Sequence, residues 1–422
     1  MHRQTLILCA ILGGLLAAQH LDEAPTGFDT PTLAANPGSQ SVSNGIAEPA
    51  GDTFALDQAQ FERKHDPSVA GTGLGPLFNA ASCAECHQNV VTGAGSQITE
   101  LRAGHRDANG NFVNPSILIN GGRTIIAGRS LVNDRATCEE AVEHLPATEN
   151  VRALRAVLST LGDGFVEAVD DNTLLAIAAN QPAQSNGQIH GEAIQVPVLE
   201  APGQTRVGRF GWKDQQPTVL SFAGDAYLNE MGVTNRLRPT DTTSVCKISS
   251  NLEDVPDSLG LANIDHFAQF IRGTKAPPRD LNLAITPDAE AGHDLFKNTG
   301  CATCHVETLV TARPGTLTNG GQYRIPEALG TKTIHPFGDY LLHDVGTGDG
   351  VVQAGPQDTA NKLRTTPLWG LHIKTRFMHD LLSLTLEDAI ERHGGEAEGV
   401  VGRFHALTPE QKAQLVTFLK SL

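Results

Sequence analysis

The chain has 422 residues, of which 40% are hydrophobic and 18% charged, with 43 Gly and 23 Pro. This length exceeds that of one small domain, and the composition is typical of a loop-rich globular protein rather than of a coiled coil or a disordered chain. The net charge of −16 argues against nucleic acid and anionic membrane surfaces as partners.

The chain begins with a short apolar segment. A basic stretch at residues 1–4 precedes about fourteen mainly apolar residues at 5–18, and Asp22 and Glu23 follow soon after. This order is typical of a secretory signal peptide, whereas a retained membrane anchor needs roughly 20 apolar residues. We therefore predict a cleaved signal at residues 1–19, which removes Cys9, and a periplasmic protein without stable membrane insertion. Residues 20–55 are rich in Gly, Pro, Ser and Ala and predict an extended tail.

Two short motifs predict the cofactors. Residues 83–87 read Cys-Ala-Glu-Cys-His, and residues 301–305 read Cys-Ala-Thr-Cys-His. In such a motif both thiols add to the vinyl groups of a haem and the histidine ligates its iron. With 7 Cys and 16 His in the chain, the pattern is expected by chance about 0.004 times. A disulfide or zinc knuckle followed by His is the alternative, but no second cysteine pair lies near either motif. We expect two covalently bound c-type haems, on Cys83, Cys86 and His87 and on Cys301, Cys304 and His305.

The first motif belongs to a predicted N-terminal domain at residues 56–275. About 100 residues, 106–205, exceed what a cytochrome c domain needs and form a predicted insertion. It contains an expected helix at 148–161, with Thr148 as its N-cap, and another at 171–179. Cys138 and Cys246 predict a disulfide in an oxidising compartment, and two buried free thiols are the alternative.

The second motif belongs to a predicted C-terminal domain at residues 285–422, after a stiff linker at 275–279. Thr286, followed by Pro287, predicts a capped helix that leads into the haem loop. Thr408, followed by Pro409, predicts a second capped helix at the C-terminus. The expected fold is therefore mainly α, with two cytochrome c-like haem domains, the N-terminal one enlarged by a long, loop-rich insertion.

The chain resembles the bacterial di-haem cytochrome c peroxidase superfamily and, within it, the di-haem oxidoreductases. The resemblance spans roughly residues 56–422. It is carried by Leu-Gly-Pro-Leu-Phe-Asn at 74–79, Gly-Arg-Phe-Gly-Trp-Lys at 208–213, Asn-Glu-Met-Gly at 229–232, and by the segments 337–346, 364–371 and 377–380.

The resemblance implies different roles for the two haems. In those peroxidases the C-terminal haem receives electrons and the N-terminal haem opens a position for peroxide, so His305 is expected at the first and His87 at the second. The family places a second axial ligand, usually Met, at a fixed distance after His379, and that distance leads here to His393. Bis-His ligation would stabilise ferric iron and lower the reduction potential. A solvated His393 at a helix end is the alternative, and Met378 is the competing ligand.

The resemblance also implies residues beside the reactive haem. Glu230 matches the family's acid–base glutamate, although the intervening Pro and one more residue are lacking, and a surface glutamate is the alternative. Trp212 matches the tryptophan between the haems, with a plain core residue as the alternative. For a distal ligand on the first haem, His105 is the nearest downstream histidine and His190 lies in the predicted insertion, yet neither has a motif around it. The family's calcium site is not expected, because Arg376 and the Leu-Leu pair at 381–382 replace its Pro and Gly.

These residues predict a peroxidase-like haem oxidoreductase, and a non-catalytic di-haem electron carrier is the alternative. The expected partners are a small redox protein as electron donor, either a cytochrome or a cupredoxin, and peroxide or another small oxidisable substrate. A thiol oxidase finds no support in the sequence, because no free reactive cysteine is evident.

Overall fold

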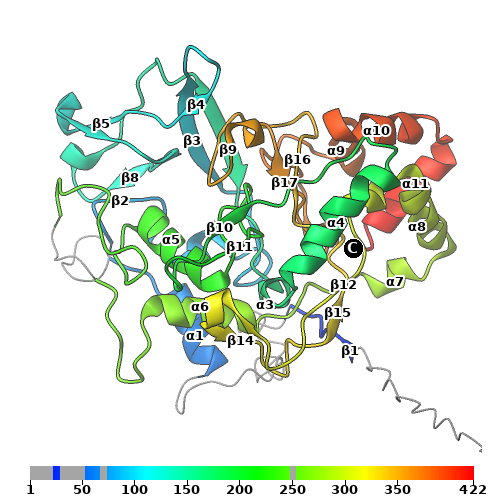
Figure 1. Cartoon of the computed structure of the whole chain (residues 1–422), viewed down its shortest axis with the longest axis horizontal. Coiled ribbons are helices and arrows are strands. Elements are labelled where there is room, and N and C mark those ends of the chain that lie inside the picture. Colours follow the sequence, from blue (N-terminus) through cyan, green and yellow to red (C-terminus); the bar gives the residue numbers. More distant parts are fainter. Residues whose placement is uncertain (1–21, 29–52, 67–73, 248–252) are drawn as a thin grey trace, which may run out of the picture.

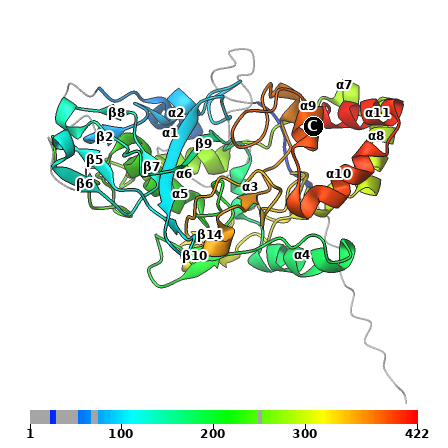
Figure 2. The same cartoon turned by 90° about the horizontal axis from the view of Figure 1, so that it is seen from above.

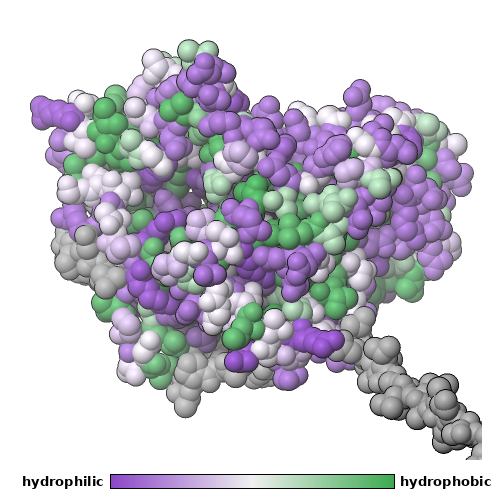
Figure 3. All heavy atoms as spheres, viewed as in Figure 1, coloured by the Kyte–Doolittle hydropathy of each residue, from purple (hydrophilic) through white to green (hydrophobic). Residues whose placement is uncertain are grey.

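The computed structural model describes residues 22–28, 53–66, 74–247 and 253–422. The predicted signal peptide lies outside these residues, as does most of the predicted tail. None of the described helices combines the length and the apolar character that crossing a membrane requires. On the face in Figure 3, hydrophilic side chains dominate on the right and hydrophobic ones gather near the middle.

The prediction of a mainly α fold is wrong. Helical residues make up 33% of the described chain and strand residues 17%, and the strands form several small sheets. Figure 1 shows most of the longer strands together in one corner, away from α8 (Pro287–Thr299), α10 (Glu398–His405) and α11 (Pro409–Leu419). The predicted insertion therefore folds as pairs of strands that hydrogen-bond to one another, and is not simply loop.

Three N-terminal helices share a cavity with the first motif. The motif forms the short helix α2 (Cys83–Cys86) beside α1 (Phe54–Glu62), and α6 (Asn263–Gly273) packs against both α1 and α5 (Val219–Met231). The largest core cluster joins these helices to the short α3 (Asp163–Glu167), and it also takes in residues from the predicted C-terminal domain. Among its members are Phe61, Phe165, Tyr227, Phe267, Phe270, Leu309, Leu329 and Trp369.

Strands of the insertion pair with β3 (Thr99–Arg106), which ends where the insertion begins. Its antiparallel partners are β4 (Phe112–Val113), β7 (Leu131–Val132) and β9 (Val151–Ala156). The helix predicted at 148–161 is therefore wrong, because residues 151–156 form β9. The helix predicted at 171–179 is confirmed as α4 (Asp171–Gln184), which starts from the N-cap Asp170. The other pairs here are β2 (Leu77–Phe78) with β8 (Arg135–Ala136), β5 (Ile117–Ile119) with β6 (Thr124–Ile126), and β10 (Gln195–Pro197) with β11 (Thr205–Val207).

Burial explains the error at β9. Arg155 is only 1% exposed, whereas the neighbouring Leu154 is 49% exposed. The Arg155 Nε donates to Asp349 at 2.6 Å, so a distant carboxylate offsets part of the cost of burying this cation. Local sequence cannot show that partner.

Both predicted helices of the C-terminal domain are confirmed. The Thr286 side chain accepts from Ala289 N at the start of α8, and the Thr408 side chain caps α11 in a capping box. The two helices pack closely, since a Cβ at Gly292 would lie 2.0 Å from Gln414 O. The shorter helices are α7 (Leu281–Ala284) and α9 (Leu386–Glu391), and Figure 2 shows α4 apart from this group.

The strands of the C-terminal half form small sheets. One sheet has three strands in the order β1 (Asp22–Glu23), β15 (Lys332–Ile334), β12 (Leu309–Val310). The other strands form two antiparallel pairs, β13 (Leu317–Thr318) with β14 (Tyr323–Arg324) and β16 (Leu342–His343) with β17 (Leu363–Arg364). Cys138 of the insertion and Cys246, which lies beyond it, form the disulfide that the sequence predicts, with Cα atoms 6.2 Å apart.

Candidate functional site

The two Cys-x-x-Cys-His motifs adopt the same local turn. In the first, the His87 N–H donates to Cys83 O at 3.0 Å, and in the second the His305 N–H donates to Cys301 O at 3.0 Å. Each motif lines its own cavity. We call the cavity of about 660 Å³ beside His87 the N-terminal cavity, and that of about 300 Å³ beside His305 the C-terminal cavity.

Two imidazoles face each other in the C-terminal cavity. The ring centres of His305 and His393 lie 6.5 Å apart, and two imidazoles that share one metal through bonds of about 2 Å place their ring centres about 6 Å apart. His305 Nδ1 lies 3.1 Å from Phe337 O and His393 Nδ1 lies 2.7 Å from Ala389 O. These contacts fix both rings with Nε2 free, which is the arrangement of second-sphere support that metal-ligating histidines commonly have.

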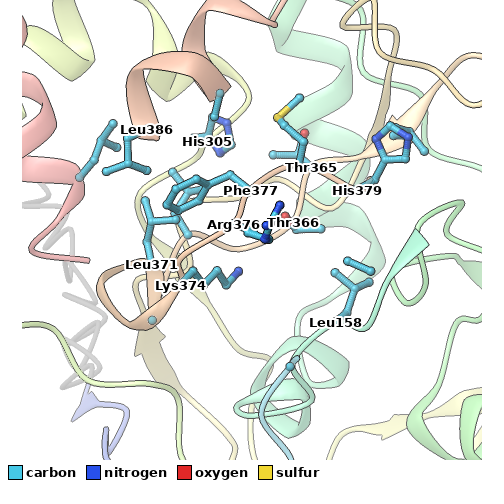
Figure 4. A pocket seen from close by; sticks show the side chains of 18 of the residues that line it. Leu158, His305, Thr365, Thr366, Leu371, Lys374, Arg376, Phe377, His379 and Leu386 are labelled. Carbon is cyan, nitrogen blue, oxygen red and sulfur yellow. The ribbon is translucent and has the colours of Figure 1, made fainter. Parts of the chain in front are cut away.

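Burial keeps both rings in the neutral form that binds a metal. It lowers the pKa of His305 to about 4, with the neighbouring His393 adding to the shift, and it lowers the pKa of His393 as well. Met378, the competing ligand, also lines this cavity. The rest of the lining is largely apolar and suits a flat macrocycle (Figure 4), with Phe296, Leu371, Phe377, Leu386, Leu415 and Leu419 among its members.

The N-terminal cavity is lined by one histidine. Burial lowers the pKa of His87 to about 4, and His87 Nδ1 is a buried atom without a hydrogen-bond partner. Among the described residues no second histidine lines this cavity, although Met231 does. The two other histidines that the sequence offered lie elsewhere: His105 Nδ1 contacts Glu149 at 2.7 Å, and His190 Nε2 contacts Gly187 O at 2.8 Å.

Glu230 lies on the lining of the N-terminal cavity as part of a carboxyl pair with Glu100. Burial, with repulsion from Glu100, raises the pKa of Glu230 to about 7. Burial acts against ionisation of Glu100 too, but Arg102 holds the Glu100 pKa below its usual value through two bonds of 2.7 and 2.8 Å. The Asn79 amide donates to Glu230 at 2.7 Å. The site thus pairs a carboxyl whose pKa is held low by Arg102 with one that exchanges its proton near neutral pH.

Sequence reasoning missed Glu100 and Arg102. The signal was available, since opposite charges two residues apart lie on the same face of a strand, and β3 is such a strand. Their approach to Glu230, 130 residues later, depends on the tertiary fold.

A wall of three chain segments separates the two cavities. The Trp212 Nε1–H donates to Ala156 O at 2.8 Å, and the Arg364 N–H donates to Trp212 O at 2.9 Å. Among the described residues, Trp212 is the one aromatic residue that lines both cavities, so it lies between the two motifs.

The described cysteines fall into two groups. Cys138 and Cys246 are joined, while Cys83, Cys86, Cys301 and Cys304 are free thiols within the motifs. Arg376, which stands where the family has Pro, lines the C-terminal cavity and donates to Leu381 O at 3.3 Å.

One protein family and several solved structures are similar to this chain. A family model described as "Di-haem oxidoreductase, putative peroxidase" matches residues 133–422. Among solved structures, hydrazine synthase from Kuenenia stuttgartiensis is 14% identical and covers 100% of both chains, with a TM-score of 0.38. The diheme peroxidase BthA from Burkholderia thailandensis is 14% identical over 89% of this chain and 88% of that chain, with a TM-score of 0.36. A MauG-like protein associated with microbial copper homeostasis is 22% identical over 38% of this chain and 52% of that chain, with a TM-score of 0.25. No curated protein sequence matches significantly.

Proposed function

The chain belongs to the di-haem oxidoreductase family, and on this premise we propose that it is an exported c-type cytochrome with peroxidase-like activity. Electrons enter at the C-terminal haem and pass to the N-terminal haem, where peroxide is reduced or a related oxidation occurs. The observation that carries this proposal is the difference between the cavities: His305 faces His393 in one, whereas His87 shares the other with the Glu100–Glu230 pair.

The residues present fit two haems. The thiols of Cys83 and Cys86 would hold one, with His87 on its iron, and those of Cys301 and Cys304 the other, with His305 and His393 on its iron. A bound haem supplies one-electron redox chemistry and, where a coordination position is open, a place for a peroxide oxygen.

Glu230 provides the proton transfer that peroxide reduction requires. Cleaving hydrogen peroxide to water needs a group that takes the proton from one oxygen and returns it to the leaving oxygen. A carboxyl with a pKa of about 7 performs both halves at neutral pH. Asn79 orients the Glu230 carboxyl, and repulsion from Glu100, partly offset by Arg102, favours its protonated form.

Trp212 lies where electrons would cross. Its ring lines both cavities, and its indole N–H is fixed by Ala156 O, so the ring fills the wall in one orientation. The net charge of −16 suits a small redox protein with a basic face as the electron donor.

A non-catalytic electron carrier is the alternative. Met231 favours it, because this thioether also lines the N-terminal cavity and could complete the coordination of the iron at His87.

The test is spectroscopic and uses the fully haem-loaded protein. We expect one haem to stay low-spin throughout, and the other to be high-spin or to open on half-reduction and then to bind cyanide. Peroxide should be consumed when a reduced donor is supplied. Two low-spin haems that ignore cyanide and peroxide in every redox state would establish the carrier instead.

A further inference from the structure

Arg364 is the one charged residue that lines both cavities within the described chain. It lies in β17, where its backbone pairs with Leu342 of β16 and its N–H donates to Trp212 O. Arg364 is 6% exposed. A permanently charged guanidinium is therefore held inside the wall between the two cavities.

The protein leaves this cation incompletely paired. Its Nη1 donates to Arg209 O at 2.8 Å, but its Nε is a buried atom without a hydrogen-bond partner. The nearest carboxylate oxygen, Asp214 Oδ1, lies 3.8 Å from that Nε, too far for a hydrogen bond. Both oxygens of Asp214 also lack hydrogen-bond partners.

The carboxyl groups around Arg364 do not supply two full countercharges. Burial raises the pKa of Asp214 well above its usual value, which favours the neutral acid. Burial raises the pKa of Asp163, the other acid near this guanidinium, to about 7. The Tyr340 ring adds only a cation–π contact at 5.7 Å.

A buried cation without a full countercharge is costly, and a guanidinium binds carboxylates through its planar fork of donors. Each haem carries two propionate carboxylates. We infer that Arg364 binds propionate groups from both cavities and acts as a single shared charge that raises the reduction potentials of both haems.

The physical consequence follows from the position of the charge. A cation near an iron favours the ferrous state, because reduction lowers the positive charge on the iron. One cation between two irons moves both potentials in the same direction and leaves the driving force between them little changed. Lys374 and Arg376 offer a contrast, since they line the C-terminal cavity alone and lie together on its wall (Figure 4).

The inference rests on two haems being bound and not on peroxide as the substrate, so its test is separate from that of the proposed function. The experiment is a potentiometric titration of the haem-loaded protein, with each haem followed by its own spectrum. In Arg364→Gln we expect both reduction equilibria to shift at least tenfold toward ferric iron, about 59 mV for each haem. Arg364→Lys, which keeps the charge, should shift each less than threefold.

Lys374→Met is the matched control, and it should shift only the C-terminal haem. An Arg364→Gln protein in which either haem keeps its potential within threefold would overturn the shared role. Should that variant fail to load both haems, Arg364→Lys decides the question by resonance Raman spectroscopy. The propionate bending bands of both haems should move in it, and unmoved bands at either haem would overturn the inference.

Discussion

The two cavities start from nearly identical motifs and have different surroundings. In the C-terminal cavity two neutral imidazoles face each other, each fixed by a backbone carbonyl. In the N-terminal cavity, His87 is the single histidine on the described lining, and the Glu100–Glu230 pair and about 660 Å³ of space accompany it. Under the proposed function, the motif specifies where a haem attaches, while residues distant in sequence decide whether its iron only carries electrons or also takes a substrate.

The regions around the two cavities also differ in the structural elements that stabilise them. Strand pairs and the Cys138–Cys246 disulfide support the N-terminal cavity. Helices α8 and α11, each capped by a threonine, support the C-terminal one. Changes that affect one region and spare the other therefore test the comparison directly.

The largest expected effect is on proton transfer in the N-terminal cavity. Glu230→Gln keeps the size of the side chain but cannot exchange a proton, so kcat/KM for peroxide should fall by roughly 10²–10⁴-fold. Steady-state kinetics measures this fall, and the spectra of both haems should be unchanged.

Asp225→Asn is the matched control for Glu230→Gln. Asp225 lies on the same helix and lines the same cavity, but it is paired with Arg238 at 2.8 Å. Its variant should retain near-native turnover. Full turnover in Glu230→Gln would remove Glu230 from the mechanism.

The Cys138–Cys246 disulfide should stabilise the region around the N-terminal cavity and not the region around the C-terminal cavity. Cys138→Ser with Cys246→Ser releases a link across 108 residues, which should lower the free energy of unfolding by roughly 2–5 kcal/mol. Because β8 pairs with β2 just before the first motif, the N-terminal haem spectrum should change at lower urea than the C-terminal one. Loss of both spectra in one shared transition would show that the two regions unfold together.

The ligand pair of the C-terminal cavity should set its potential. His393→Met replaces an imidazole by a thioether, which favours ferrous iron, so the reduction equilibrium of this haem should shift roughly a hundredfold, about 120 mV. The N-terminal haem should keep its potential. His405→Gln is the control, since His405 pairs with Glu391 and does not line the cavity. An unchanged potential in His393→Met would assign the second ligand to another residue, with Met378 the first to examine.

Local signals in the sequence were sufficient to predict α8, which leads into the second motif, and α11, which ends the C-terminal region. Thr286 and Thr408, each followed by Pro, mark their helix starts because a cap acts within one turn. The same reasoning failed at residues 151–156, where a partner strand and Asp349 determine the structure of β9. Cap signals report only nearby contacts, so a strand stabilised by a distant carboxylate is not visible to them.

Prediction of the candidate site from local sequence has the same limit, because long-range contacts leave no local signal. The motif residues could be predicted because covalent attachment and ligation need a fixed spacing. The pairing of Glu100 with Arg102 could have been predicted as well, but the roles of Glu100 and Arg364 in the site could not. Each role arises only where segments more than 100 residues apart meet, at Glu230 for Glu100 and at Trp212 for Arg364.

The smallest expected effect is the pH dependence, and it separates the two cavities without any substitution. Burial and Glu100 raise the pKa of Glu230 to about 7, so the carboxylate that accepts the peroxide proton is lost as the pH falls below that value. We expect kcat/KM to be level above about pH 7 and to fall about tenfold per unit below it. The C-terminal haem should keep one potential between about pH 6 and 8, because burial holds His305 neutral with a pKa of about 4 and lowers the pKa of His393 too. The two N-terminal cavity variants provide the control. The fall in kcat/KM below about pH 7 should disappear in Glu230→Gln and persist in Asp225→Asn, since only the first substitution removes the titrating carboxyl. If the fall persists in Glu230→Gln, another group of the N-terminal cavity carries the proton, and Glu100 becomes the candidate.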